Sequence, residues 1–166
     1  MKRTTSRAVA IRLAPFLLAL IVSLVLGRAH SIYVNRQAVF IWAAYEGDIT
    51  RMKVMYSLGV DVNEPACPSR RCITPLVDAG WGGHPESIQF LLDRGADVNK
   101  TGKFGETALM MAAYCGYDDS VELLLSRGAD VNTTDRNGNT ALSFAKQREH
   151  QTTIDLLRRA GAKENP

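Results

Sequence analysis

Apolar side chains recur at intervals of three and four residues in two similar stretches of the chain, residues 87–93 and 120–126. In the second stretch Val121, Leu124 and Leu125 are separated by polar residues and fall on one helical face. This spacing predicts amphipathic helices, each with one buried stripe. A shorter and more continuously apolar segment precedes each stretch, so the pattern predicts helices in pairs and an all-α fold.

The predicted helix pairs recur at a nearly constant interval. Gly59, Gly95, Gly128 and Gly161, which follow the second helix of each pair, are 36, 33 and 33 residues apart. Glycine readily adopts the left-handed conformation that ends a helix. One helix pair of this size cannot bury its own apolar stripe, so neighbouring units must share a core.

Threonines begin the last three units. Thr74, Thr107 and Thr140 are 33 residues apart, and a threonine hydroxyl is a good helix N-cap. Pro75 suits the first helical position, because the N–H that it lacks has no partner there. Gly80 falls inside the first helix of the second unit, which it is expected to weaken by roughly 1 kcal/mol relative to alanine.

The units resemble ankyrin repeats. Residues 74–99 read TPLVDAGWGGHPESIQFLLDRGADVN, and residues 107–132 read TALMMAAYCGYDDSVELLLSRGADVN. The threonine, the alanines, the G-H or G-Y turn, the leucine-rich helix and GADVN are similar to that family's motifs. The resemblance implies an all-α ankyrin repeat solenoid of about four stacked helix-turn-helix repeats with finger loops. We expect the repeat domain at residues 38–163, with repeats at about 38–66, 67–102, 103–135 and 136–163, and a tail at 164–166.

Residues 1–31 have the pattern of an export signal. A basic leader precedes an apolar run at residues 13–26, and small residues follow. Fourteen helical residues span roughly 21 Å, less than the roughly 30 Å of a hydrocarbon core, which favours a cleaved signal peptide. Cleavage after Ala29 or Ser31 fits the small-residue rule.

An uncleaved signal anchor is the alternative. If Arg12 snorkels, the apolar stretch begins at Ala8 and becomes long enough to span the bilayer. Membrane contact would then involve residues 8–27 alone. A short linker is expected at residues 32–37. Both alternatives place the repeats outside the cytoplasmic membrane, periplasmic or secreted after cleavage and otherwise anchored by a single pass.

The net charge of +3 conceals an uneven distribution. Residues 1–31 hold five of the 20 basic residues and no acid. Subtracting these five leaves 15 bases against 17 acids, so residues 32–166 carry about −2. This balance argues against nucleic acid as a partner, because phosphate backbones select clustered Lys and Arg.

Catalytic and cofactor motifs are not evident in the repeats. His84 and His150 fall in repeat turns, where ankyrin units often carry histidine. The glycines at residues 80–83 follow a helix and not a strand, unlike a phosphate-binding loop. We therefore expect no enzyme activity, no catalytic residue, no metal and no cofactor.

Two cysteines lie close together in the first inter-repeat loop. Cys67 and Cys72 flank the part of the chain where the repeat spacing is 36 and not 33. In an exported protein this arrangement predicts a disulfide that stabilises by roughly 2 kcal/mol and presents Arg70 and Arg71 on a stiffened finger. Cys115 would remain unpaired.

The resemblance also implies a binding face, made by the finger loops and the exposed side of the first helices. Tyr45, Trp81 and Tyr114 occupy equivalent positions, seven residues after the start of each unit. They predict either an aromatic groove or side chains that fill the stack between neighbouring helices. The finger positions add the remaining candidate partner-binding residues, Arg70, Arg71, Ile73, Lys103, Phe104, Arg136 and Asn137.

The sequence therefore predicts a non-enzymatic interaction module outside a membrane. It would act as a monomer and bind an unidentified protein of acidic or mixed charge through its concave face and finger loops. Two alternatives remain. One is a structural spacer or stabilising subunit, and the other is thiol-based protection against oxidation through Cys67, Cys72 and Cys115.

Overall fold

The computed structural model describes residues 36–66 and 72–164, all within the compact unit Arg36–Pro166. The described residues form four helix pairs, and one isolated antiparallel bridge joins Ala66 to Ile73. The predicted all-α class and the ankyrin repeat solenoid are confirmed. The helices are residues 36–46, α2 (Ile49–Ser57), α3 (Pro75–Gly82), α4 (Pro85–Leu92), α5 (Ala108–Cys115), α6 (Asp118–Ser126), α7 (Ala141–Gln147) and α8 (Gln151–Arg159).

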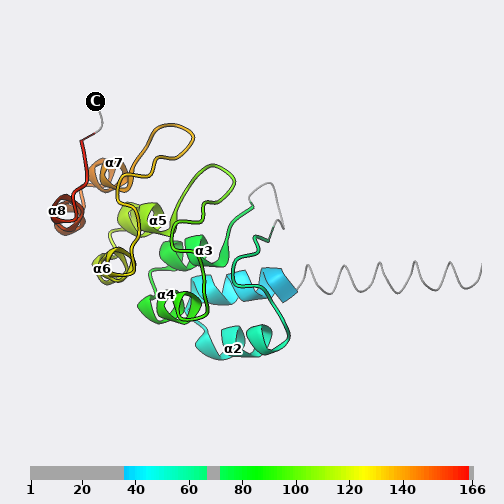
Figure 1. Ribbon diagram of the computed structural model, residues 1–166. Coiled ribbons are helices and arrows are strands. Elements are labelled where there is room, and N and C mark those ends of the chain that lie inside the picture. The colour runs from blue at the N-terminus through cyan, green and yellow to red at the C-terminus, as the bar shows by residue number, and fades with distance from the viewer. Residues whose placement is uncertain (1–35, 67–71, 165–166) are drawn as a thin grey trace, which may run out of the picture. The chain divides into compact units, whose positions relative to one another are not determined.

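The helices form two layers. The first helices of the repeats form one row, in which α3 packs on α5 and α5 on α7, and the second helices α4, α6 and α8 form the other. The loops that precede α5 and α7 extend beyond the first row as long fingers (Figure 1). The helix of residues 36–46 begins within the predicted linker, since residues 36 and 37 are already helical.

Threonine caps fix where three of the first helices begin. The Thr74 hydroxyl accepts a hydrogen bond from the Val77 N–H at 3.3 Å. The hydroxyls of Thr107 and Thr140 do the same for the third residue of α5 and α7. All three threonines are buried, so each cap satisfies a backbone donor that would otherwise lack a partner.

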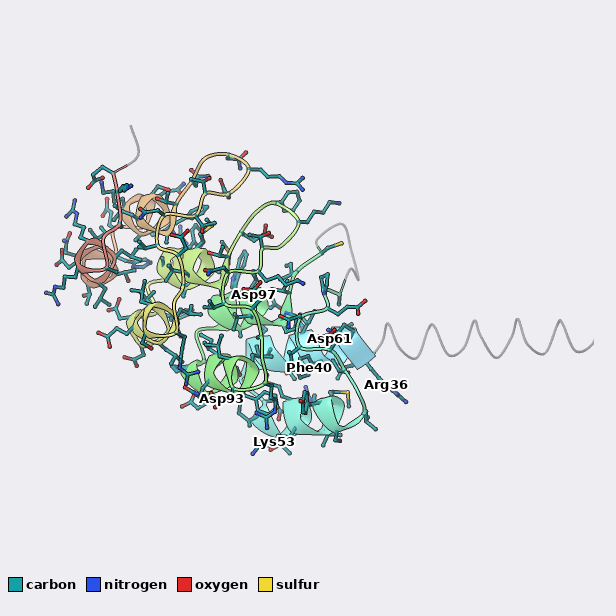
Figure 2. All side chains as sticks on the ribbon, in the orientation of Figure 1. Arg36, Phe40, Lys53, Asp61, Asp93 and Asp97 are labelled. Atoms are coloured by element: carbon teal, nitrogen blue, oxygen red, sulfur yellow. The ribbon has the colours of Figure 1, made fainter. Side chains whose placement is uncertain are left out.

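The core runs continuously from repeat to repeat. Leu76, Leu109 and Leu142, at equivalent positions of successive first helices, are each no more than 2% exposed. In the first repeat Phe40 lies between its own helix and α2, whereas Lys53 projects away from the stack (Figure 2). No single repeat could bury its apolar side chains alone, so neighbouring repeats share one core, as the repeat spacing predicted.

Glycines let the first helices approach closely. A Cβ atom on Gly80 would lie 2.5 Å from the carbonyl oxygen of Ala108, and one on Gly82 would collide with the carbonyl oxygen of Tyr45. The expected weakening of this helix relative to alanine considers helix propensity alone. Packing opposes an alanine here, because its Cβ would push α3 and α5 apart.

The asparagine of each GADVN-like segment joins one repeat to the next. The Asn99 side chain donates to the Gly128 carbonyl at 3.3 Å and accepts from the Asp130 N–H at 2.8 Å. Asn63 bonds in the same way to Gly95 and Asp97, and Asn132 to Gly161 and Lys163. Three amide clamps therefore bridge the three repeat junctions, which explains why this segment recurs.

Candidate functional site

Two columns of side chains line the first helices. Tyr45, Trp81 and Tyr114 form the predicted column. Trp42 in the first repeat and Phe144 in the fourth lie at the repeat position three residues before that column. Residues three apart on a helix share a face. Sequence reasoning missed Trp42 and Phe144 because it compared a single position of the repeat, although the three-residue spacing could have revealed them.

Ring contacts link the aromatic side chains of repeats two to four. The Trp81 and Tyr114 ring centroids are 6.3 Å apart, and the Tyr114 and Phe144 centroids are 5.8 Å apart with nearly perpendicular planes. In the first repeat Trp42 lies 5.8 Å from Tyr45. Trp81 and Tyr114 are half-buried, so they both pack against neighbours and present surface to solvent.

An apolar groove of about 150 Å³ lies beside this series of rings. Its walls come from the first helices of the last three repeats and from the loops that precede α3, α5 and α7. Ile73, Trp81 and Phe104, three of the predicted binding residues, meet here. The described residues that line it are Ile73, Val77, Trp81, Phe104, Glu106, Met111, Asp135 and Phe144.

Two carboxylates supply the charge of the groove. Glu106 accepts a hydrogen bond from the Phe104 N–H at 2.7 Å. Asp135 accepts from the N–H groups of Asn137 and Asn139, both at 2.8 Å. These bonds hold both side chains in place, so the groove combines a fixed negative charge with aromatic and aliphatic walls.

Four predicted residues lie on the fingers. Lys103, Phe104, Arg136 and Asn137 are exposed, and Phe104 retains 47% of its accessible surface. The Lys103 N–H donates to the Cys72 carbonyl and the Arg136 N–H donates to the Phe104 carbonyl, both at 2.9 Å. These backbone bonds tie successive fingers together, so the fingers present one continuous edge.

Arg70, Arg71 and Cys67 lie outside the described residues. The basic finger and the Cys67–Cys72 disulfide therefore remain predictions. The described chain on either side is closely paired, since the Ile73 N–H donates to the Ala66 carbonyl at 3.3 Å.

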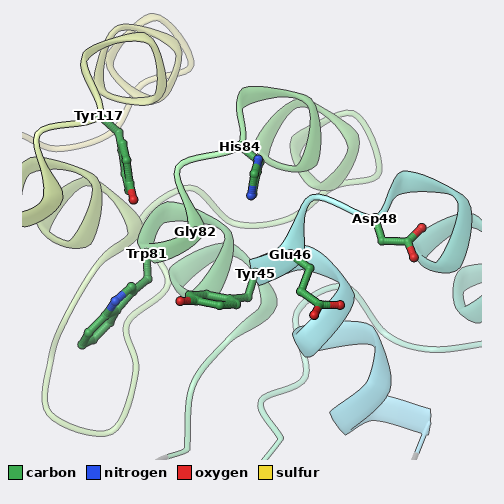
Figure 3. A pocket seen from close by; sticks show the side chains of 7 residues that line it. All are labelled: Tyr45, Glu46, Asp48, Trp81, Gly82, His84 and Tyr117. Atoms are coloured by element: carbon green, nitrogen blue, oxygen red, sulfur yellow. The ribbon is translucent and has the colours of Figure 1, made fainter.

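A second hollow, more open and more polar, lies over the turns of the first repeats. Tyr45 and Trp81 lie on one side of it, and His84 and Tyr117 approach from the other (Figure 3). Its carboxylates are engaged by Arg51, which lies 3.1 Å from Glu46 and 3.4 Å from Asp48. In the described part of the chain its lining is Tyr45, Glu46, Asp48, Trp81, Gly82, His84 and Tyr117.

The two repeat histidines have packing roles. A Cβ atom on Gly47 would lie 2.7 Å from the His84 ring, and one on Gly116 would lie 2.6 Å from the His150 ring. The His150 Nε2 atom also lies 3.1 Å from the Tyr114 carbonyl oxygen. Each ring therefore covers the glycine turn of the preceding repeat, which accounts for its position without catalysis.

Cys115 is the half-buried last residue of α5. Its thiol lies 3.9 Å from the Trp81 carbonyl oxygen. Burial raises the pKa of the Cys115 thiol, and the nearby Arg148 charge opposes that shift only in part. A raised pKa lowers the thiolate fraction at neutral pH and so lowers the reactivity of the thiol.

The described residues contain no cluster of three or more His, Cys, Asp or Glu side chains able to hold a metal ion. Within the same residues no helix has the length and apolar character needed to cross a membrane. The apolar run at residues 13–26 lies outside the described part of the chain.

Comparison with known families identifies the repeats. Residues 76–166, more than half of the chain, match the family model described as ankyrin repeats (3 copies). The chain belongs to the ankyrin repeat family, as its sequence motifs predicted. Ankyrin repeats generally act as protein–protein interaction modules and are typically not enzymes.

A curated bacterial relative is similar over part of the stack. A stretch of 66 residues is 38% identical to YahD of Escherichia coli (strain K12), which is named as an ankyrin repeat protein. The aligned stretch covers 40% of this chain and 31% of YahD. The chain thus spans about a third of the length of the relative that it matches.

Proposed function

We propose that the repeat stack binds a protein partner through the face formed by its first helices and finger loops. The observation that carries this proposal is the apolar groove beside Trp81 and Phe104. Trp42 also retains 56% of its accessible surface on this row of helices. Large aromatic side chains that remain accessible are the usual anchors of protein interfaces, because they bury much area with few rotatable bonds.

The proposed partner carries mixed charge. Glu106 and Asp135 give the groove negative charge, whereas Lys103 and Arg136 place positive charge on the exposed fingers. A uniformly acidic surface would be repelled by the groove, and a uniformly basic one by the fingers. Complementarity therefore favours a segment that alternates in charge.

We further propose that the module works outside the cytoplasmic membrane and catalyses no reaction. The basic leader and apolar run at residues 1–31 support export, with cleavage or retention as an anchor. Alkaline phosphatase fused after residue 166 tests the location, because that enzyme folds only where disulfides form. Active fusions in cells support export, and inactive but abundant fusions would refute it.

A disulfide between Cys67 and Cys72 fits the same location. The two cysteines lie close together in the chain, and exported proteins form disulfides in an oxidising compartment. Intact mass with and without reductant tests the bond, and three free thiols in the oxidised, denatured protein would refute it.

A crosslinked pull-down from the envelope fraction tests the binding proposal. The native chain is compared with Phe104→Ala and with the double variant Trp81→Ala, Tyr114→Ala. Leu58→Ala is the matched control, because Leu58 is 48% exposed, as Phe104 is, but lies after α2 and away from the groove. Circular dichroism must show an unchanged fold.

Loss of one captured protein in the groove variants but not in Leu58→Ala supports the proposed face. Equal capture by all variants places the contact elsewhere and favours the spacer alternative. Thiol-based protection has weaker support, because the pKa of Cys115 is raised rather than lowered.

A further inference from the structure

The groove beside Trp81 has the chemistry of a cation site. Trp81, Phe104 and Phe144 supply aromatic walls, while Glu106 and Asp135 supply carboxylates. Among the described residues that line it, none carries a positive charge. Aromatic faces and carboxylates both attract cations, and the attraction strengthens where water is partly excluded.

Neutral donors hold the two acids in place. Glu106 accepts a hydrogen bond from the Phe104 N–H, and Asp135 accepts from the N–H groups of Asn137 and Asn139 and from the Asn139 side-chain amide. The salt bridges of the described residues involve other acids, namely Glu46, Asp48, Asp93 and Glu164. A cation in the groove would therefore meet two charges that no described ion pair uses.

The protein already places guanidinium groups on aromatic rings elsewhere. The Arg94 guanidinium carbon lies 3.6 Å from the Phe90 ring centroid and 5.2 Å from that of Tyr56. The Arg148 guanidinium lies 4.5 Å from the Tyr114 ring centroid. Stacking of this kind suits arginine, whose planar cation is more weakly hydrated than the ammonium group of lysine.

We propose that the groove binds an arginine side chain supplied by an extended segment of the partner. The inference rests on the proposed function and names the side chain that the groove selects. The guanidinium meets the aromatic walls and the carboxylates of Glu106 and Asp135. Neighbouring acidic residues of the same segment face Lys103 and Arg136 on the fingers.

Blocked pentapeptides of glycine with one central guest residue test the proposal. Arginine is compared with citrulline, which has nearly the same shape without charge, and with lysine and glutamate. Binding to the full chain is followed by nitrogen–proton NMR, using the indole N–H signals of Trp81 and Trp42. Trp42 serves as an internal reference, because it does not line the groove.

The arginine peptide is expected to shift the Trp81 signal with a millimolar Kd and to leave Trp42 unchanged. Citrulline and glutamate should bind at least about fivefold more weakly, and lysine about threefold more weakly, since a cation over an aromatic face contributes roughly 1 kcal/mol. Equal binding of citrulline, or stronger binding of lysine or glutamate, would overturn the assignment. No Trp81 shift at about 10 mM arginine peptide would overturn it too.

A charge variant provides a second readout. Glu106→Gln keeps an oxygen that accepts from the Phe104 N–H but removes the negative charge. It should weaken arginine binding about threefold to fivefold and leave citrulline binding unchanged. Glu122→Gln makes the same change on the exposed side of α6 and should have no effect.

The pull-down separates this inference from the proposed function. If the groove variants lose the partner but the arginine peptide does not bind, only the choice of arginine fails. If the groove variants keep the partner, the binding face itself is wrong, whatever the peptides do.

Discussion

Replacing Asn99 with alanine should uncouple the two halves of the repeat stack. The Asn99 amide is the clamp between repeats two and three, with bonds of 3.3 Å to the Gly128 carbonyl and 2.8 Å from the Asp130 N–H. Each bond contributes about 0.5–1.5 kcal/mol when net solvation is counted. Because the clamp is exposed and water can replace it, the expected loss is about 1–2 kcal/mol in total.

The position of the tryptophans makes the uncoupling measurable. The two tryptophans of the chain, Trp42 and Trp81, both lie on the N-terminal side of this junction. In urea, tryptophan fluorescence reports repeats one and two, whereas far-ultraviolet circular dichroism reports all the helices. The native chain should show coincident transitions, and Asn99→Ala should show separate ones, because repeat stability depends on nearest-neighbour junctions.

Two further variants check the reasoning. Asn99→Asp retains an oxygen for the Asp130 N–H but sets a carboxylate against the Gly128 carbonyl, so it should be at least as destabilising as alanine. Asn137→Ala removes an exposed amide whose side chain makes no hydrogen bond within the described residues, and it should change stability by less than about 0.5 kcal/mol. Coincident transitions and a loss below about 0.5 kcal/mol for Asn99→Ala would refute the clamp.

Four other outcomes are expected. Glu149 has a φ of 60° at the turn position where earlier repeats have glycine, so Glu149→Gly should raise the free energy of unfolding by about 0.5–1 kcal/mol in urea titrations; destabilisation would contradict this. Gly82→Ala should lower the free energy of unfolding by about 2 kcal/mol or more, because the added Cβ meets the Tyr45 carbonyl oxygen. An unchanged Tm in calorimetry would count against the close approach. Because burial raises the pKa of Cys115, iodoacetamide should modify this thiol severalfold more slowly at pH 8 in the folded than in the urea-unfolded protein, and equal rates would exclude the shift. The raised pKa stabilises the folded state below the ordinary thiol pKa, and this stabilisation is lost as the pH rises through the folded-state pKa. The Gln89 amide is the main cause of the lowered pKa of Asp93, with Arg127 second, so Gln89→Ala should raise that pKa in an NMR titration, and an unchanged value would argue against the hydrogen bond.

The sequence predicted the fold well because the repeat imposes the same local requirements in every unit. The threonine caps at Thr74, Thr107 and Thr140 and the regular glycine spacing each act within a few residues, so pattern alone reveals them. The role of Gly80 could not be read in this way. A glycine inside a short helix looks unfavourable until the neighbouring helix is placed against it.

The candidate site was only partly predictable for a related reason. Comparing equivalent positions found Tyr45, Trp81 and Tyr114, but the groove also needs Phe144 and the carboxylate of Glu106. Glu106 lies on a loop outside the periodic helices. Whether its carboxylate reaches the groove depends on how neighbouring finger loops pack against each other. The basic finger expected at residues 70–71 lies outside the described residues, and among the described lining residues the charge comes from Glu106 and Asp135.

Photocrosslinking from the finger is the most direct test of the proposed binding face. Benzoylphenylalanine is placed in separate chains at Phe104, on the edge of the groove, and at Glu122, on the exposed side of α6. After irradiation in cells, the account predicts one discrete protein adduct from position 104 and none from position 122. An adduct from position 122 alone, or identical adducts from both, would contradict a partner bound in the groove.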